Sequence, residues 1–466
     1  MTSWVRRADG SGIYTRPCGP MEHAYVTMVH TTSRHGREDF VISFIIQFSE
    51  DASSPGHQLP LDQRLREAWK ILRFEHPMIA VELGQDEQSL LYTSTVDQES
   101  SLEQWLAETF IVEADEQRPA GAVLARPRPP RLMELRFFPN TGELLLQSSH
   151  WRIDGAGCSL LMNRFFDIMA TQDIPTSLAW GEEVSRLPPA IEDALQLPSE
   201  ASPEHEKWGR DWISDFGAAS PSVGLPCCPN PGGTPGNPGR ELLILSEEDT
   251  ATLVSACKMA GITVTAALHA AAVLQTREMA PAETRSNNFM SVLMCDLRSY
   301  LPEPYNTSSY AVIICSMPQL GVFGSLPERD FMNTSKMVME SSRGYDMHTM
   351  LQSLRPASDA FRQMLEMGAA SSETPSVVPP VVSSLGVLEK YMGPRHGSIT
   401  IERVHSISAI QSPQPTLCLN SWRGRTSLDM VYNDGFITAE LAREFVRGVV
   451  STVSKGLGLQ FSGIGK

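Results

Sequence analysis

The sequence predicts an α/β protein of two domains, each a mixed sheet flanked by helices. Three observations support this prediction. The chain has 466 residues, which is more than one usual domain. Strand-like segments alternate with segments of helical periodicity in both halves. A stretch rich in proline and glycine separates the halves. We therefore expect an N-terminal domain at 1–200, a linker at 201–240 and a C-terminal domain at 241–466.

The first half contains both kinds of element. The run FVISFIIQF (Phe40–Phe48) is short, continuous and rich in β-branched residues, which predicts a buried strand. In the segment 61–76 apolar residues recur at helical spacing, and Pro77 then ends the predicted helix. Further strands are expected at 80–83, 89–95, 132–138 and 143–149, and a further helix at 102–110.

The sequence SPSVGLPCCPNPGGTPGNPGR, at the end of the expected linker, has no hydrophobic period and is too rich in proline and glycine for a core element. The second half then opens with a strand at 241–245. Ser246 as N-cap, acidic residues in the first turn and Gly261 as the stop specify a helix. The remaining expected elements are helices from 263 and at 438–454 and strands at 288–294, 310–316, 399–406, 416–422 and 427–432.

Composition excludes several classes of protein. Apolar residues make up 41% of the chain and charged residues 20%, as in ordinary soluble globular proteins. The net charge of −16, without a basic run, argues against a nucleic-acid partner. No signal peptide and no apolar run of membrane-spanning length is present. The eight cysteines show no paired metal spacing and are expected to be reduced and mostly buried. We expect a cytoplasmic monomer that binds no membrane.

The stretch Gly142–Met169 carries the leading candidate for chemistry. A predicted strand ends at His150, Asp154 follows four residues later, and a glycine-rich turn leads into an apolar helix near Cys158. A histidine at the end of a strand is held by a rigid backbone and faces an opening, which suits a general base. We therefore expect His150 to be catalytic. Asp154 alone would be interpreted as a helix cap or turn residue.

The same spacing occurs at His35 and Asp39. That copy lies in a charged, turn-like segment, without a strand before it or a glycine after it. We interpret it as a solvated loop. The context of His150, rather than the spacing, carries the prediction.

The segment SHWRIDGAG resembles the His-x-x-x-Asp-Gly signature of CoA-dependent acyltransferases. This superfamily includes plant alcohol acyltransferases, trichothecene O-acetyltransferases and the condensation domains of peptide synthetases. Three other stretches are similar to the family in order and spacing: Leu61–Ile79, Ile262–Leu274 and Cys295–Pro304. The sequence as a whole most resembles the fungal branch of the superfamily, whose members acetylate sesquiterpenoid alcohols.

The resemblance implies two lobes like chloramphenicol acetyltransferase, with a tunnel between them and the catalytic histidine in its middle. It implies transfer of an acyl group, most simply from acetyl-CoA, to the hydroxyl of an apolar secondary metabolite such as a terpenoid. No metal and no permanently bound cofactor is needed. In the family the aspartate is structural, orients the histidine loop and pairs with an arginine. The matching residues here are Asp154 and Arg298.

Two features around these motifs are less specific. Gly155 and Gly157 suit a close backbone approach and positive φ. The family's second signature, Asp-Phe-Gly-Trp-Gly, is largely absent, because only Trp422 and the final glycine remain. Asn420 and Ser421 are candidate donors to a thioester oxyanion, and Trp422 is a candidate substrate contact. An ordinary polar strand end is the alternative interpretation.

Two other functions remain open at this point. A condensation-type or cyclase-like enzyme of the same fold would act on a carrier-bound substrate. A binding or cyclising descendant would fold a substrate in the tunnel without acyl transfer. Activity with free acetyl-CoA separates the three.

Overall fold

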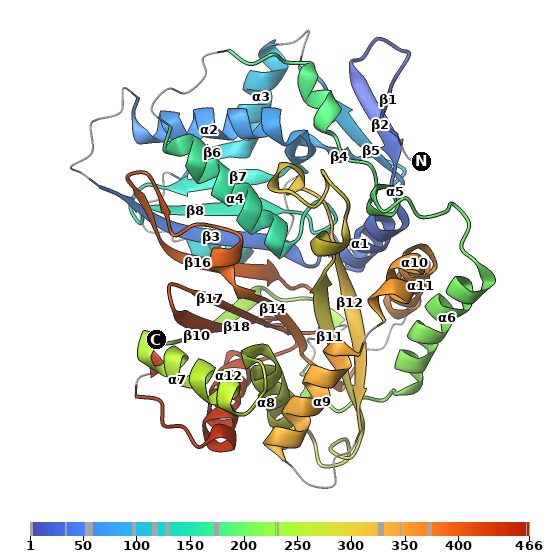
Figure 1. The fold of residues 1–466 in the computed structure, drawn as a ribbon, viewed down its shortest axis with the longest axis vertical. Coiled ribbons are helices and arrows are strands. Elements are labelled where there is room, and N and C mark those ends of the chain that lie inside the picture. The colour runs from blue at the N-terminus through green and yellow to red at the C-terminus, as the bar shows by residue number, and fades with distance from the viewer. Residues whose placement is uncertain are drawn as a thin grey trace.

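The computed structural model describes residues 3–32, 35–51, 59–95, 99–113, 120–125, 131–171, 177–228, 230, 233–324, 330–344, 346–370, 375–462 and 464–465. Two large sheets dominate the fold, and each forms one lobe with its helices (Figure 1). The first sheet has the strand order β15-β16-β3-β8-β7-β6, and the second has the order β12-β11-β14-β17-β18-β10-β19. The mixed α/β class with two lobes is therefore confirmed.

The strands of the first sheet are β3 (Val41–Glu50), β6 (Phe110–Val112), β7 (Glu134–Phe138), β8 (Glu143–Ser148), β15 (Arg395–His396) and β16 (Ile399–Ala409). Those of the second sheet are β10 (Pro238–Leu245), β11 (Phe289–Asp296), β12 (Ser316–Phe323), β14 (Val381–Val387), β17 (Thr416–Trp422), β18 (Arg425–Asn433) and β19 (Ile464–Gly465). Smaller sheets hold β1 (Val5–Arg6), β2 (Ile13–Pro17), β4 (Glu82–Leu83) and β5 (Ser89–Thr93), and β9 (Leu225–Pro226) with β13 (Val377–Val378).

The helices are α1 (Pro20–His30), α2 (Leu61–Glu75), α3 (Glu99–Thr109), α4 (Gly155–Met169), α5 (Ile191–Ala194), α6 (Pro203–Ala218), α7 (Glu247–Met259), α8 (Val264–Met279), α9 (Phe331–Arg343), α10 (Met347–Gln352), α11 (Leu354–Ala370) and α12 (Ala439–Leu457). The predicted N-cap Ser246 accepts from Asp249 N, and Thr438, where the last helix was expected to begin, accepts from Leu441 N in the same way. Each serine or threonine satisfies one of the backbone N–H groups that a helix start leaves without a partner.

The first sheet is completed by a strand from the other half of the chain. β16 pairs antiparallel with β3 from Ile399, opposite Glu50, to Ala409, opposite Val41. The red-orange β16 accordingly lies beside the blue β3 in Figure 1. β3 pairs on its other edge with β8, so it lies inside the sheet, as its continuous apolar sequence indicates. The lobes therefore do not divide simply at the expected linker, and the domain boundaries remain a prediction.

The expected linker also contains regular structure. α6 occupies its first part, with Ser202 as N-cap accepting from His205 N and Pro203 in the first turn. The segment 201–240 is therefore not irregular throughout, and its role as the linker between the domains stays a prediction. Proline at the first helical position stabilises a helix start, because its missing N–H would have no partner there. Among its described residues, the proline- and glycine-rich part that follows forms the two-residue strand β9 before β10 begins.

All eight cysteines are free, and four of them are buried. No single helix of the described ranges has the length and apolar composition to cross a membrane. By those criteria alone the bent pair α7 and α8 qualifies.

Asp39 joins β3 to the end of β16. Its side chain is fully buried, and Oδ1 accepts from the backbone N–H groups of Phe40 at 2.9 Å and Gln411 at 2.7 Å. The interpretation of this segment as a solvated loop is therefore wrong. The start of β3 and the end of β16 lie side by side, where the hydrogen bonds between the strands stop. The carboxylate supplies the acceptor that the backbone N–H groups at these strand ends would otherwise lack.

Replacing Asp39 with alanine should destabilise the protein. Two N–H groups at a buried strand end would lose their acceptor, at a cost of about 1–3 kcal/mol in the free energy of unfolding. Urea unfolding followed by circular dichroism measures this. Asp215→Ala, on an exposed part of α6, is the control and should stay within about 0.5 kcal/mol of wild type. Equal stability of the two variants would contradict the role of Asp39.

Candidate active site

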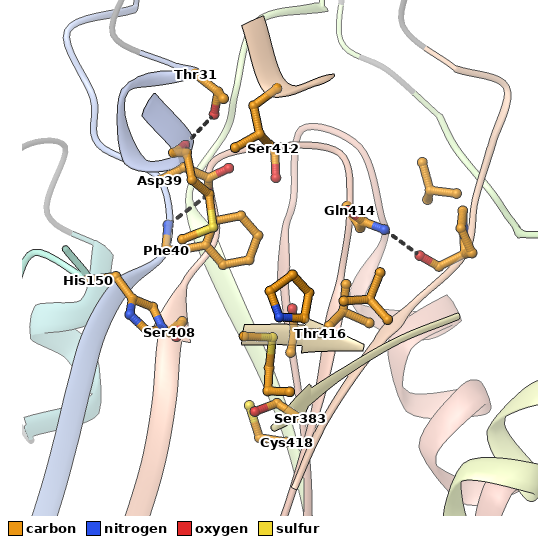
Figure 2. Close-up of a pocket in the computed structure, with 18 of the residues that line it drawn as sticks. Thr31, Asp39, Phe40, His150, Ser383, Ser408, Ser412, Gln414, Thr416 and Cys418 are labelled. Carbon is orange, nitrogen blue, oxygen red and sulfur yellow. Dashed lines mark hydrogen bonds between the residues drawn. The ribbon is translucent and has the colours of Figure 1, made fainter. Parts of the chain in front are cut away.

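A cavity of about 1120 Å³ lies where the two large sheets meet. The start of β3, the turn after β8 and the end of β16 border it from the first sheet, and β11, β12, β14 and β17 border it from the second. Figure 2 shows residues from several of these elements around it. The cavity is large enough to hold a drug-sized molecule and part of a second one.

His150 lies in the turn that follows β8 and borders this cavity. Its Nδ1 is buried, and its ring lies 5.2 Å from the ring of Tyr25, centroid to centroid. The hydroxyl of Tyr25 is in turn held by Ser316. Burial lowers the pKa of His150 below its ordinary value of 6.5, while the backbone carbonyls of His150 and Ile153 and the charge of Asp154 act in the opposite direction. A neutral imidazole near pH 7 is the form that a general base requires.

Asp154 fixes the turn that carries His150. Its Oδ1 accepts from Gly157 N at 2.8 Å, which caps α4, and its Oδ2 accepts from Cys315 N at 2.9 Å. Arg298 Nη1 lies 2.8 Å from Oδ1 and 2.9 Å from Oδ2. The ion pair expected from the resemblance is therefore present. It is buried, with the side chains of Arg298 and Asp154 only 8% and 5% exposed, and the structural role of Asp154 stays a prediction.

Arg298 also organises the segment between residues 311 and 315. Its Nη2 donates to the carbonyls of Ala311 at 3.3 Å and Ile313 at 3.4 Å. This segment was expected to be a strand, because it reads AVIIC, but only the next residues form a strand, β12. That prediction is wrong because Ala311 O and Ile313 O bond to Arg298 and Cys315 N bonds to Asp154, so these groups are not available to a neighbouring strand.

The two glycines after Asp154 have different neighbours. A Cβ at Gly157 would come within 2.4 Å of the carbonyl oxygen of Ala311, and one at Gly155 within 2.9 Å of the side chain of Leu385. The expected close approach is therefore present at both positions. Neither has positive φ, since both lie in the first turn of α4, and that part of the prediction is wrong.

Arg152 was missed by the sequence analysis. It is fully buried and donates to the carbonyls of Val81 and Arg131 and to the hydroxyl of Ser148. These bonds attach the His150 turn to the rest of the first lobe. Only its position between His150 and Asp154 could have indicated a role, since its partners lie far away in sequence.

The candidates on β17 divide into two groups. Asn420 borders the cavity, and its Oδ1 accepts from Ser427 Oγ at 2.8 Å, which leaves Nδ2 as its donor side. Ser421 pairs with Thr426, and Trp422 is buried with Nε1 donating to Ile401 O. Neither of these two residues borders the cavity. Substrate contact is therefore not supported for Ser421 or Trp422, which bind neighbouring strands instead.

Comparisons with known proteins agree with this site. The family model described as 15-O-acetyltransferase Tri3 matches residues 139–323, which include both His150 and Arg298. The O-acetyltransferase pigM of Monascus ruber is 29% identical over 402 residues, 85% of this chain and 77% of pigM. The acetyltransferase pigO of the same organism is 28% identical over 459 residues, 95% of this chain and 96% of pigO. The chain is an acyltransferase, similar to the Tri3 acetyltransferases over these residues.

Solved structures show the same fold for this acyltransferase. TRI3 trichothecene 15-O-acetyltransferase from Fusarium sporotrichioides has a TM-score of 0.82 at 18% identity, with 97% of each chain covered. The first condensation domain of the calcium-dependent antibiotic synthetase has a TM-score of 0.67 at 15% identity, with 96% of this chain and 98% of that domain covered. At these identities the likeness concerns the fold. The shared fold is consistent with the two lobes described above.

Replacing Arg298 with methionine should leave the carboxylate of Asp154 buried without its counter-charge. The free energy of unfolding of the acyltransferase should fall by about 3–5 kcal/mol, measured by chemical unfolding. The control is Arg425→Met, because the pair of Arg425 with Glu247 is exposed and should contribute about 0–1 kcal/mol. A similar small change in both variants would show that the buried pair does not hold the turn.

Proposed function

We propose that this acyltransferase moves an acetyl group from CoA to a hydroxyl of an apolar secondary metabolite, with His150 as the general base. The observation that carries the proposal is the position of His150: its imidazole borders a large cavity shared by both lobes, in a turn that buried ion pairing and hydrogen bonds hold in place. The related proteins named acetyltransferases support the acyl group.

The chemistry follows from one imidazole. His150 removes the hydroxyl proton as the acceptor oxygen attacks the thioester carbonyl. A C–O bond forms, the C–S bond then breaks, and the imidazolium returns its proton to the leaving sulfur. Asn420 Nδ2 is the candidate donor to the oxyanion that develops between these steps. The lowered pKa of His150 keeps its imidazole neutral, so that it can act as a base, and the nearby carboxylate of Asp154 favours the imidazolium that follows.

The cavity wall supports an apolar acceptor. Met290, Val292 and Met294 of β11 border it at alternating positions, beside Leu320 of β12. Methionine side chains adapt to irregular apolar shapes. A hydrocarbon framework would therefore bury its surface here when its hydroxyl reaches His150.

A condensation-type reaction is the alternative that the fold permits, since condensation domains share it. Such an enzyme would receive its acyl group from a carrier protein rather than from free acetyl-CoA. Docking of an acidic carrier protein would require a basic surface, and the net charge of −16 disfavours such docking. Transfer from free acetyl-CoA supports the first proposal, and transfer only from an acyl-carrier protein would replace it.

His150→Ala should lower kcat for transfer of a labelled acetyl group by roughly 10²- to 10⁴-fold, because the attacking hydroxyl loses its base. The assay uses acetyl-CoA with a panel of terpenoid and polyketide alcohols. His23→Ala, on α1 outside the cavity, serves as the control and should keep the wild-type rate. Full activity of the His150 variant would remove the mechanism.

The pH dependence of kcat/KM should report the lowered pKa of His150. The base works only when neutral, so activity should be lost as the pH falls through this pKa, and the midpoint of the acidic limb should lie below 6.5. Rates across the acidic range, at saturating acetyl-CoA, measure it. An acidic midpoint above 6.5 would show that the imidazole is not desolvated as the structure indicates.

A further inference from the structure

One face of the second sheet forms part of the cavity wall, and its polarity changes from strand to strand. Along β11 the cavity-lining side chains Met290, Val292 and Met294 are apolar, with Asp296 at the strand end, and the neighbouring strand β12 contributes Leu320, which pairs with Val292. α11 adds Phe361 and Met364. Apart from Asp296 and Ser316, which bond to Arg298 and Tyr25, the wall formed by β11, β12 and α11 offers a ligand mainly apolar contacts.

The opposite half presents small hydroxyl side chains. Ser383 lies on β14, Thr416 on β17 and Ser408 near the end of β16, and all three border the cavity (Figure 2). We call these three residues the hydroxyl patch. Ser383 and Thr416 are neighbours on adjacent strands, since Ser383 pairs with Cys418, which follows Thr416 by two residues on the same face. Ser408 comes from the other sheet, on β16, which contacts β17.

The hydroxyl patch has unused hydrogen-bonding capacity. Thr416 is only 5% exposed, and its Oγ1 is buried without a hydrogen bond to any residue that the structure describes. Ser384, next to the patch, differs because its hydroxyl bonds to Thr265 at 3.0 Å. Ser383 and Ser408 are half-buried and open to the cavity. A buried hydroxyl without a partner is unfavourable, and a bound ligand that supplies one removes that cost.

The patch lies to one side of the catalytic histidine. In the first sheet Ser408 pairs with Ile42, and Ile42 pairs with Ser148, which precedes His150 by two residues. Two strand spacings, about 10 Å across the sheet, thus separate the backbone of Ser408 from that of Ser148. A group bound at the patch therefore belongs to a part of the ligand remote from the reacting bond.

We propose that the hydroxyl patch binds a second oxygen atom of the acceptor, far from the hydroxyl that is acetylated. This inference rests on the proposed function and narrows its substrate class. The acceptor is a rigid, apolar alcohol that carries another carbonyl or hydroxyl oxygen at about 10 Å, the distance of two strands. Its hydrocarbon framework packs on β11 and β12, and its remote oxygen bonds to the hydroxyls of β14, β16 and β17.

Binding of two rigid probes tests this inference without depending on turnover. Androstanol is a tetracyclic alcohol, and epiandrosterone carries an additional ketone on its far ring. Calorimetric titration of the full-length protein, without acetyl-CoA, should show epiandrosterone binding about 3- to 10-fold more tightly, the value of a hydrogen bond. Ser383→Ala combined with Ser408→Ala should abolish this preference, and Thr416→Val should reduce it.

The controls separate binding from folding. Thr400→Val removes a threonine hydroxyl from the far end of β16, outside the cavity, and should keep the preference. Thr416→Val should not lower the melting temperature, because its hydroxyl bonds to none of the described residues and its removal takes an unpaired polar group out of the interior. Equal affinity for the two probes, or binding of neither, would overturn the inference.

A further outcome would assign the patch to the other substrate. If the patch variants weaken binding of acetyl-CoA and leave the probe preference unchanged, the patch contacts the pantetheine arm and the inference is wrong. Failure of the proposed function looks different, since it would appear as probe binding without labelled acetyl transfer by the wild-type protein.

Discussion

The buried ion pair between Asp154 and Arg298 is the interaction on which the rest of the site depends. It joins residues 144 positions apart and from different lobes, at 2.8 Å. The same carboxylate caps α4 and accepts from Cys315 N. One aspartate thus fixes the start of a helix, the turn before it and a segment of the second half of the chain. A buried charge of this kind is stable only when all its partners are present, so the turn has one arrangement.

The second constraint is the re-entry of the chain into the first sheet. β16 crosses from the second half and pairs along the whole of β3, and Asp39 holds the end of that pairing. The cavity lies between this composite sheet and the second sheet, and the ends of β3, β8 and β16 converge on it. Its walls therefore come from residues at both ends of the sequence. A change in either half can alter the shape of the site.

Local pattern was enough to predict much of this structure. The strand before His150, the helix after it and the capped helices of the second half follow from periodicity and caps. The pairing of Asp154 with Arg298 came from resemblance to a family, because spacing alone does not pair residues so distant. What could not be predicted depends on distant partners. Asp39 looked solvated because its second donor, Gln411, lies 372 positions away. The AVIIC segment looked like a strand because its real partners are two side chains.

The chemistry requires that the thioester and the imidazole share the cavity. A crystal structure of the protein with CoA tests this most directly. The account predicts the CoA sulfur inside the cavity, with the acyl carbon it would carry placed so that a hydroxyl oxygen fits about 3–3.5 Å away and within hydrogen-bonding reach of His150 Nε2. CoA bound with its sulfur outside the cavity, or separated from His150 by the packed wall, would contradict it.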